Sequence, residues 1–238
     1  MELFYSNNIT GGTIILDGTE SRHCIKVLRK SIGDKINVVD GKGSLYKGII
    51  KSDNLRDCKI KILETIKNYD KRDNYIHIAI SPIKNSNRVE WFIEKVVEIG
   101  VDEISFIDCD RTLRHSVKME RIFKTSISAM KQTLKATLPK INDICSFEDF
   151  LDSSIHSNKF ICHLEDGNRK EIFHFKNQLS KISDSCILIG PEGDFSMDEI
   201  AMAKKYNFNA ISLGDSRLRT ETAGIIACHL LNIINRYD

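Results

Sequence analysis

Two polar, glycine-containing segments near the C-terminus have residue types that suit a ligand site. In the first, Cys186–Tyr206, an apolar stretch is followed by a loop with Gly190 and Gly193, and then by Ser196 and Glu199 in capping-box spacing. Such glycines allow close backbone approach to a ligand, and free N–H groups before a helix suit a nucleotide or another polar cofactor. The G-x-G-x-x-G fingerprint and the P-loop lysine motif are both missing from the sequence. On pattern alone, a structural turn is equally compatible.

The second segment, Ile211–Tyr237, has a similar arrangement, because an apolar stretch ends at Gly214 and a polar loop leads into a long helix. Loops at the carboxyl ends of neighbouring parallel strands converge on one crevice, the usual ligand site of an open α/β sheet. We therefore expect the two loops to meet, with Arg217, Arg219 and Glu221 at the edge of the crevice. In the structural alternative, Thr220 caps the helix and Glu221 complements its dipole.

Alternating strands and helices must position these loops. After the polar segment Asn68–Asn74, short apolar runs alternate with amphipathic stretches, which is the pattern of an α/β domain with a buried parallel sheet. Within it, Arg88–Ile99 repeats apolar residues at helical spacing and ends at Gly100, a residue type favoured at helix C-termini. The predicted strands are Tyr75–Ile80, Glu103–Ile107, Lys159–His163, Ser185–Ile189 and Ala210–Leu213.

The residues before this polar segment have a different pattern, in which short strands are separated by turns. The strands predicted here are Lys35–Val39, Ser44–Ile50 and Lys59–Thr65. One helical stretch, Glu20–Lys30, interrupts them; Ser21 is its expected cap, and its basic residues gather on one exposed side. A small β-barrel suits this pattern, so the sequence predicts two domains.

Basic residues are unevenly distributed, although the formal net charge of the chain is only +2. Residues 1–72 contain 14 Lys and Arg against 9 Asp and Glu, a net charge of +5. Residues 111–140 contain 8 basic residues against Glu120 alone, a net charge of +7. Phosphate backbones are attracted to such surfaces in a salt-dependent way, so nucleic acid is a natural partner. A solvated surface without a partner remains the alternative interpretation.

Composition is that of an ordinary globular protein, with 41% hydrophobic and 29% charged residues. The sequence has no signal-peptide pattern and no stretch close to the roughly 20 apolar residues of a membrane span. We therefore expect a cytoplasmic protein. Its 7 cysteines are scattered and form no C-x-x-C pair, so we interpret them as reduced structural thiols and expect no metal site.

Specific motifs add a resemblance to a known family. GPEG at Gly190–Gly193, followed by LG at Leu213–Gly214 and LRTETA at Leu218–Ala223, resembles the ribosomal RNA small subunit methyltransferase E family of the SPOUT superfamily. The paired motifs are specific to that family. The agreement covers nearly the whole chain, because it extends to Arg22–Arg29, Lys84–Val101 and Met130–Ile141.

The resemblance implies an RNA-binding, PUA-like β-barrel at residues 1–70 and an α/β SPOUT domain at residues 74–238, with a parallel sheet and a deep trefoil knot. It also implies a homodimer whose cofactor pocket lies near the subunit interface. The implied reaction is methylation of N3 of a specific uridine in 16S ribosomal RNA of the small subunit, with S-adenosylmethionine as cofactor and without a metal. Such a protein must place the nucleophile in line with the methyl group and help N3 to lose its proton.

Roles can be assigned to particular residues. We expect Arg219 to stabilise the developing uridine anion and Glu221 to accept the N3 proton. The resemblance implies that the cofactor is bound by His163, Leu164, Glu165, Ile189, Gly190, Pro191, Glu192, Gly193, Leu213, Gly214 and Leu218. The residues expected to bind RNA are Arg22, His23, Lys26, Arg29, Arg111, Arg114, Lys131 and Lys135.

The chain departs from the family pattern at two places. Many members have glycine where this chain has Asp194, and many have Glu-Gln-Ser/Cys-Gly-Arg where this chain has Lys131–Lys135. Lys135 could contact phosphate in place of that arginine, but only as a point charge. Two alternative functions remain: a non-catalytic RNA-binding or ribosome-assembly protein, and a SPOUT enzyme that acts on another RNA position.

Overall fold

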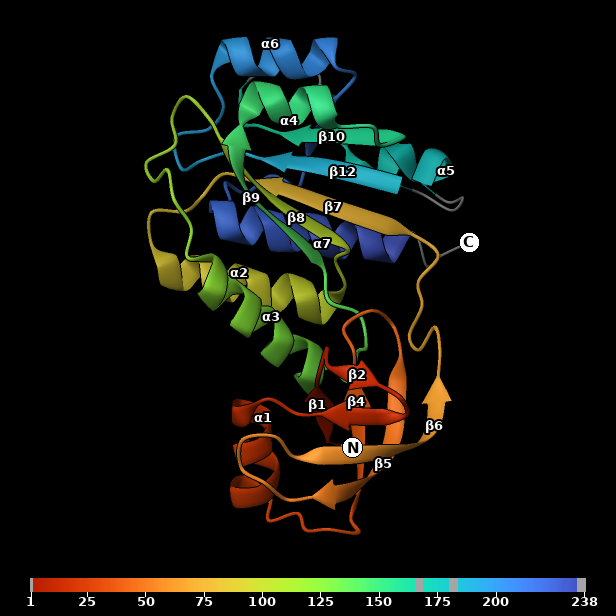
Figure 1. Cartoon of the computed structure of the whole chain (residues 1–238). Coiled ribbons are helices and arrows are strands. Elements are labelled where there is room, and N and C mark those ends of the chain that lie inside the picture. Colours follow the sequence, from red (N-terminus) through yellow and green to blue (C-terminus); the bar gives the residue numbers. More distant parts are fainter. Residues whose placement is uncertain (1, 166–168, 180–183, 235–238) are drawn as a thin grey trace. The chain divides into compact units, whose positions relative to one another are not determined.

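The computed structural model describes residues 2–165, 169–179 and 184–234 (Figure 1). The chain forms two compact units, Met1–Lys71 with Ile127–Leu138, and Arg72–Ser126 with Pro139–Asp238. The sequence predicted domains at residues 1–70 and 74–238, so the structure differs by grouping Ile127–Leu138 with the first unit. Among the described helices, none combines the length and the apolar character needed to cross a membrane.

The first unit is built on a six-stranded sheet with the order β1-β4-β5-β6-β3-β2. β1 and β4 are parallel, and the other neighbouring strands are antiparallel. Alternate side chains such as Ile36, Val38, Ile50 and Ile60 are buried in one apolar core. The strands are β1 (Leu3–Tyr5), β2 (Ile9–Thr10), β3 (Thr13–Ile15), β4 (Lys35–Val39), β5 (Leu45–Ser52) and β6 (Lys59–Ile66). The three strands predicted in this region are therefore confirmed.

The helical stretch of the first unit begins earlier than predicted. Helix α1 (Gly18–Arg22) continues as a π-helical turn (His23–Val27), and Asp17 caps α1 by accepting two backbone N–H groups, each at 2.8 Å. The prediction that Ser21 is the cap is wrong. Ser21 is fully buried, and its hydroxyl oxygen accepts the Cys58 N–H at 2.9 Å, which joins the helix to the start of β6.

The segment Ile127–Leu138 is held in the first unit by backbone pairing and by a buried ion pair. The Gly43 N–H donates to the Ala136 carbonyl, and the Leu138 N–H donates to the Gly41 carbonyl, both at 2.9 Å. The Lys131 ammonium pairs with the buried Glu20 carboxylate. These contacts explain why a segment that follows the first strands of the α/β unit in sequence belongs to the β-rich unit.

The second unit contains a seven-stranded, entirely parallel sheet with the order β11-β13-β10-β12-β7-β8-β9. Its strands are β7 (Tyr75–Ile80), β8 (Glu103–Asp108), β9 (Lys140–Ser146), β10 (Asn158–Cys162), β11 (Lys170–Glu171), β12 (Asp184–Ile189) and β13 (Asn209–Ser212). The five predicted strands are confirmed with small shifts of their ends. The edge strands β9 and β11 were not predicted, because neither is a continuous apolar run.

Helices cover both faces of this sheet (Figure 1). α2 (Ser86–Ile99) and α7 (Thr220–Ile234) pack together on one face, and α4 (Phe147–Ser153) and α6 (Met197–Lys205) lie on the other. The predicted helix at residues 88–99 and the Ser196–Glu199 capping box are both confirmed. Helix α3 (Met119–Gln132) contributes residues to both units. The other described elements are a 3₁₀ turn (Ile172–Phe175) and α5 (Lys176–Leu179).

The C-terminal part of the chain crosses the sheet in an unusual order. β10 precedes β12 and β13 in sequence but lies between them, and α7 then returns to pack against β7 and β12. The expected trefoil knot depends on the path of the connection from β10 to β12. Residues 166–168 and 180–183 of that connection lie outside the described residues, so the knot remains an expectation.

Gly224 allows close contact between α7 and α2. A Cβ atom at Gly224 would lie 2.6 Å from Phe92 Cε2 and 3.3 Å from Ile80 Cδ1. We therefore expect Gly224→Ala to lower the free energy of unfolding by about 1–3 kcal/mol, the usual cost of overpacking. Urea denaturation of the full chain measures this change.

The control is Gly224→Ala in a Phe92→Leu background, where the aromatic ring that causes the clash is gone. The cost of the alanine should be smaller there, as expected for two residues in contact. Alanine favours a helix over glycine by about 1 kcal/mol, so a stabilised Gly224→Ala protein would contradict the predicted clash.

Candidate active site

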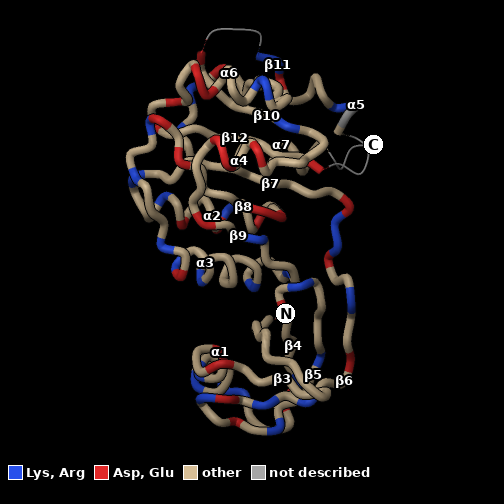
Figure 2. The backbone as a smooth tube through the Cα atoms, turned by 45° about the horizontal axis from the view of Figure 1, so that its top comes forward, with Lys and Arg blue, Asp and Glu red and all other residues tan. Residues whose placement is uncertain are grey.

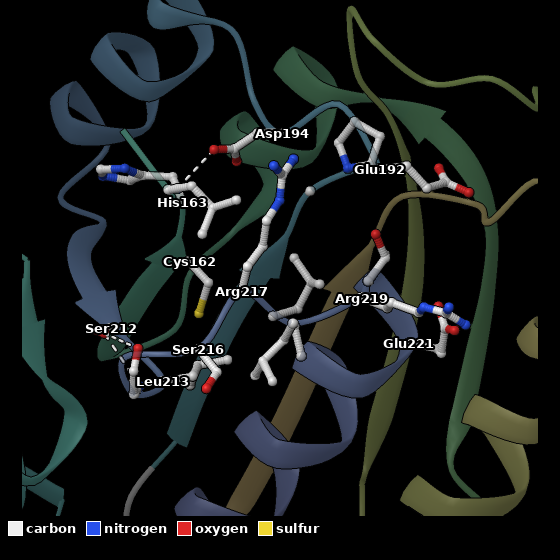
Figure 3. Close-up of a pocket in the computed structure, with 18 of the residues that line it drawn as sticks. Cys162, His163, Glu192, Asp194, Ser212, Leu213, Ser216, Arg217, Arg219 and Glu221 are labelled. Atoms are coloured by element: carbon white, nitrogen blue, oxygen red, sulfur yellow. Dashed lines mark hydrogen bonds between the residues drawn. The ribbon is translucent and has the colours of Figure 1, made fainter. Parts of the chain in front are cut away.

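A cavity of about 430 Å³ lies in the second unit, beyond the carboxyl ends of β10, β12 and β13 (Figure 3). Its walls are formed by the segments that follow these three strands and by the start of α7. Because β10 pairs with both β12 and β13, the three loops must emerge side by side. The expected convergence of the two glycine loops is therefore observed. The volume of the cavity is in the range of small-molecule sites.

The loop after β12 is a tight turn that excludes side chains at its first glycine. The Asp194 N–H donates to the Pro191 carbonyl at 3.0 Å, which closes the turn. A Cβ atom at Gly190 would lie 3.0 Å from the ring of Phe195, a fully buried residue. Outside the turn, the Glu192 carboxylate accepts the Lys84 N–H at 3.1 Å. Glycine at this position thus lets the turn pack closely on the Phe195 ring.

Arg111 braces this loop from the neighbouring β8–α3 connection. Its guanidinium donates to the Gly193 carbonyl at 2.8 Å and to the Phe195 carbonyl at 3.4 Å. A Cβ atom at Gly193 would approach the Arg111 side chain to 3.3 Å. Gly193 is therefore needed for the close approach of the arginine.

Asp194 joins two walls of the cavity. One carboxylate oxygen accepts the Leu164 N–H at 2.7 Å, and the other accepts the Phe195 N–H at 2.8 Å (Figure 3). Asp194 has a φ of 64°, a conformation that aspartate and asparagine adopt more readily than most residues. The residue that departs from the family glycine thus links the loop after β10 to the loop after β12.

Burial decides the ionisation of two groups near the bottom of the cavity. Desolvation raises the pKa of the Cys162 thiol, and the nearby Asp194 carboxylate raises it further. Desolvation lowers the pKa of His163, and the Asp194 carboxylate partly opposes that shift. Cys162 is therefore a protonated thiol near neutral pH and a poor nucleophile, which argues against covalent catalysis by this residue.

Arg219 and Glu221 lie together on one wall, where the last loop enters α7 (Figure 3). The Glu221 side chain is only 6% exposed, and its carboxylate forms an ion pair with Arg88 Nε of α2 at 3.5 Å. Arg219 is exposed, and its carbonyl accepts the Ala223 N–H at 2.8 Å in the first turn of α7. The site therefore holds a buried carboxylate beside two guanidinium groups.

Comparison with known proteins identifies the family. The RNA methyltransferase domain family matches residues 70–232, and the RNA methyltransferase PUA domain family matches residues 16–63. The ribosomal RNA small subunit methyltransferase E 2 of Borreliella burgdorferi is 31% identical over 91% of this chain and 90% of that protein. The chain belongs to the ribosomal RNA small subunit methyltransferase E family.

Solved structures have the same fold. A probable rRNA-methyltransferase from Porphyromonas gingivalis superposes with a TM-score of 0.90 at 35% identity, and the match covers 99% of each chain. A ribosomal RNA small subunit methyltransferase E from Neisseria gonorrhoeae, bound to S-adenosyl methionine, has a TM-score of 0.86 at 24% identity over 98% of each chain. The chain therefore has an N-terminal PUA domain and a C-terminal methyltransferase domain of the SPOUT type.

The cavity of this methyltransferase family member gathers most of the residues expected to bind a cofactor. Glu165 and Gly193 do not border the cavity. His163 does border it, but its ring points away from the wall that carries Arg219 and Glu221 (Figure 3). The cavity is also lined by residues that were not predicted to bind the cofactor, among them Arg88, Cys162 and Arg169. Arg88 belongs to α2, which is distant in sequence from the cavity loops, so no local sequence pattern could predict its place in the lining. The expected residues that do line the cavity are His163, Leu164, Ile189, Gly190, Pro191, Glu192, Leu213, Gly214 and Leu218.

Some of the residues expected to bind RNA are exposed, and others form hydrogen bonds or ion pairs within the protein. In the PUA unit, Arg22, Lys26 and Arg29 are exposed, and Figure 2 shows basic positions throughout that unit. His23 is half-buried with its ring edge against Phe4, at a centroid distance of 6.0 Å. The exposed arginines and lysine of the α1 region are thus accessible to a phosphate backbone.

The other residues expected to bind RNA have environments of their own within the protein. Lys131 is only 18% exposed because of its pairing with Glu20, and Arg111 braces the cavity loop. Arg114 donates to the Ser116 and Lys84 carbonyls at 2.9 and 3.3 Å, and Lys135 is half-buried. Further along the same basic segment, Arg121, Lys124 and Lys140 form ion pairs with Glu90, Glu120 and Glu103. Glu90 and Glu103 lie outside this segment and offset part of its +7 charge, but the Arg121, Lys124 and Lys140 side chains are 51%, 72% and 66% exposed and so remain accessible.

Substitution of Asp194 tests its role as the link between the two loops. Asp194→Asn tolerates the positive φ but keeps only one of the two acceptor oxygens, so its stability should lie between those of the parent protein and Asp194→Gly. Asp194→Gly should lose about 1 kcal/mol with the hydrogen bonds, and Asp194→Ala should lose about 1–2 kcal/mol more because its Cβ disfavours this conformation. Urea denaturation gives the order, and hydrogen exchange should show faster exchange of the Leu164 amide in the glycine and alanine variants.

The matched control is Asp198→Ala in the first turn of α6, a nearby acidic residue whose side chain takes no part in this link. It should leave exchange at Leu164 unchanged. An unaltered exchange rate in Asp194→Gly would show that the carboxylate does not hold the two loops together.

Proposed function

We propose that the protein methylates N3 of a specific uridine in 16S ribosomal RNA, with S-adenosylmethionine as the methyl donor. One observation carries the proposal. The two glycine motifs of the family meet at a single cavity, and the same cavity is bordered by a buried carboxylate and an exposed arginine. A protein that only binds RNA has no physical need for both features at one crevice.

The residues around the cavity fit this cofactor. Apolar side chains of Ile189, Ile211, Leu213 and Leu218 offer a surface for a flat base, and charged groups at the rim offer partners for an amino acid moiety. A Cβ atom at Gly190 would point at the Phe195 ring, 3.0 Å away, so this glycine lets the turn pack closely beside the cavity. When bound, S-adenosylmethionine supplies an electrophilic methyl group.

Arg219 and Glu221, on one wall of the cavity, would prepare the nucleophile. Uridine N3–H is a weak acid, so the reaction needs a base for its proton and a cation for the negative charge that develops on the ring. We assign the proton to the Glu221 carboxylate and the charge stabilisation to the Arg219 guanidinium. Arg88, 3.5 Å from the Glu221 carboxylate, would fix its orientation.

The RNA would be held mainly by the PUA domain. Its exposed Arg22, Lys26 and Arg29 suit phosphate contacts, which position the RNA but do not read its sequence. Choice of the uridine would then rest on the cavity and on the folded shape of the RNA. We also propose that the protein acts as a homodimer, as the family resemblance implies.

Methyl transfer to unmodified small ribosomal subunits tests the proposed reaction. We expect label from S-adenosylmethionine to appear in 3-methyluridine after nucleoside digestion and mass spectrometry. Label in another nucleoside would overturn the choice of N3 while keeping methyl transfer. Binding of S-adenosylmethionine without any transfer to subunits or to naked 16S RNA would favour the non-catalytic alternative.

Two substitutions test the assigned roles. Arg219→Ala should reduce turnover by about 10²–10³-fold, the usual loss when one stabilising donor is removed. Glu221→Gln should reduce it by about 10²–10⁴-fold, the range for general base catalysis, and the remaining activity should rise with pH as more uridine ionises in solution. Cofactor affinity, measured by calorimetry, should change little in both. The matched control is Lys204→Ala, an exposed basic residue of α6 that does not line the cavity.

Near-normal turnover in Arg219→Ala would remove that residue from the chemistry. A fully active Glu221→Gln protein would mean that another group or solvent takes the proton.

A further inference from the structure

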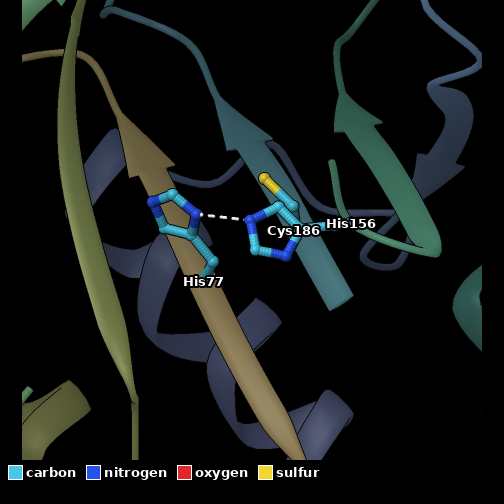
Figure 4. Close-up of side chains that lie close together, drawn as sticks. All are labelled: His77, His156 and Cys186. Atoms are coloured by element: carbon cyan, nitrogen blue, oxygen red, sulfur yellow. Dashed lines mark hydrogen bonds between the residues drawn. The ribbon is translucent and has the colours of Figure 1, made fainter. Parts of the chain in front are cut away.

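Three side chains that bind metals in other proteins converge in the core of the second unit (Figure 4). His77 of β7 and Cys186 of β12 are directly opposite each other in the parallel pairing of these strands, so their side chains lie on the same face of the sheet. His156 reaches them from the connection between α4 and β10. The cluster lies in the amino-terminal halves of both strands, whereas the cavity lies at their carboxyl ends.

The spacing of the candidate ligand atoms is compact. One ring nitrogen of each histidine and the Cys186 sulfur all lie within 4.8 Å of one another. His77 Nδ1 is 2.8 Å from His156 Nε2, so a proton lies between the two nitrogens in the metal-free protein. A small ion could take the place of that proton.

In both histidines, the ring nitrogen that faces away from the cluster already has a polar partner. His156 Nδ1 pairs with the Asp184 carboxylate, and His77 Nε2 is 2.8 Å from Ser105 Oγ. Asn142 Nδ2 donates to the same serine oxygen at 2.8 Å, which fixes it in turn. Histidines that ligate metals are almost always oriented in this way, with a carboxylate or another polar group on the second nitrogen.

One polar atom beside the cluster lacks a partner. Ser154, two residues before His156, has its hydroxyl next to the Cys186 thiol. Its Oγ is buried and has no hydrogen-bond partner of acceptable geometry among the described residues. A buried hydroxyl in this situation is costly, and a metal-bound water would satisfy it.

We propose that His77 Nδ1, His156 Nε2 and Cys186 Sγ bind one Zn²⁺ ion, with a water molecule as the fourth ligand. Two imidazoles and one thiolate suit this borderline-soft ion, which favours four tetrahedral ligands. The Cys186 thiol releases its proton to solvent on binding, and His77 carries its proton on Nε2, directed at Ser105. Zn–N bonds of about 2.0–2.1 Å require the two nitrogens to separate to about 3.3 Å, an opening of roughly 0.5 Å.

The site would act as a structural clamp. It would join two central strands of the sheet to the α4–β10 connection, at the end of the domain opposite the cavity. The inference therefore stands independently of the proposed methyl transfer, and it is tested by metal binding rather than by activity.

Cobalt is the first probe, because Co²⁺ replaces Zn²⁺ in such sites and absorbs light. The full-length protein, stripped of metal and kept reduced, is titrated with Co²⁺ alone. We expect one equivalent to give a thiolate-to-cobalt charge-transfer band and the visible bands of tetrahedral cobalt, both removed by one equivalent of Zn²⁺. Absence of these bands at one equivalent would overturn the proposal.

Variants locate the ion. Cys186→Ser should abolish the charge-transfer band, whereas Cys145→Ser, a thiol of β9 outside the cluster, should keep it. Asp184→Asn changes a partly exposed residue that only orients His156, and it should weaken Zn²⁺ binding about 10–100-fold while the protein stays folded. A band that survives in Cys186→Ser, or Zn²⁺ affinity unaltered in Asp184→Asn, would place the metal elsewhere.

Thermal unfolding provides a second readout. Zn²⁺ binds the folded state, so it should raise the Tm of the parent protein in a concentration-dependent way and raise that of His77→Gln much less. An equal rise in both proteins would contradict the assignment of His77 as a ligand.

Discussion

Parallel pairing of β10 with both β12 and β13 is the constraint on which the cavity depends. It places three loops that are far apart in sequence at one edge of the sheet, where their backbones form a single crevice. The loop after β12 also packs closely on its surroundings at two positions that lack side chains. Gly190 accommodates the Phe195 ring, and Gly193 accommodates Arg111. The arrangement of the loops is thus set by strand order first and by glycine packing second.

Hydrogen bonds then fix loops that the sheet merely brings together. Asp194 joins the loop after β10 to the loop after β12, and Arg111 holds the latter through its carbonyls. Charged side chains therefore stabilise the loops around the cavity through hydrogen bonds. Charged side chains also interact within the first unit, where Lys131 and Glu20 pair in a largely buried position. Charge on a sequence is consequently a poor measure of charge on a surface.

The sequence predicted the central strands, the paired glycine loops and most of the cavity lining, because these features depend on local residue patterns. It failed where a distant partner decides the outcome. Asp17 caps α1 in place of Ser21 because Ser21 is taken into the core to bond Cys58. The internal partners of Arg111 and Lys131, the Gly193 carbonyl and the Glu20 carboxylate, are likewise distant in sequence and were not predicted. The pairing of His77 with Cys186 depends on strand register, which the scattered cysteines could not reveal.

The discontinuity of the first unit has a consequence for the order in which the protein can fold during synthesis. Its sheet is complete at Ile66, but the segment that carries Lys131 is made only after β7, α2 and β8 have been translated. Until then, the Glu20 carboxylate lacks the Lys131 ammonium that pairs with it in the finished protein, so we expect the nascent first unit to be less stable than the finished one. Domains usually fold one after another as the chain leaves the ribosome. Here the N-terminal domain gains its full set of contacts only after part of its successor has been made, and the isolated piece Met1–Lys71 would lack the Lys131 partner of Glu20.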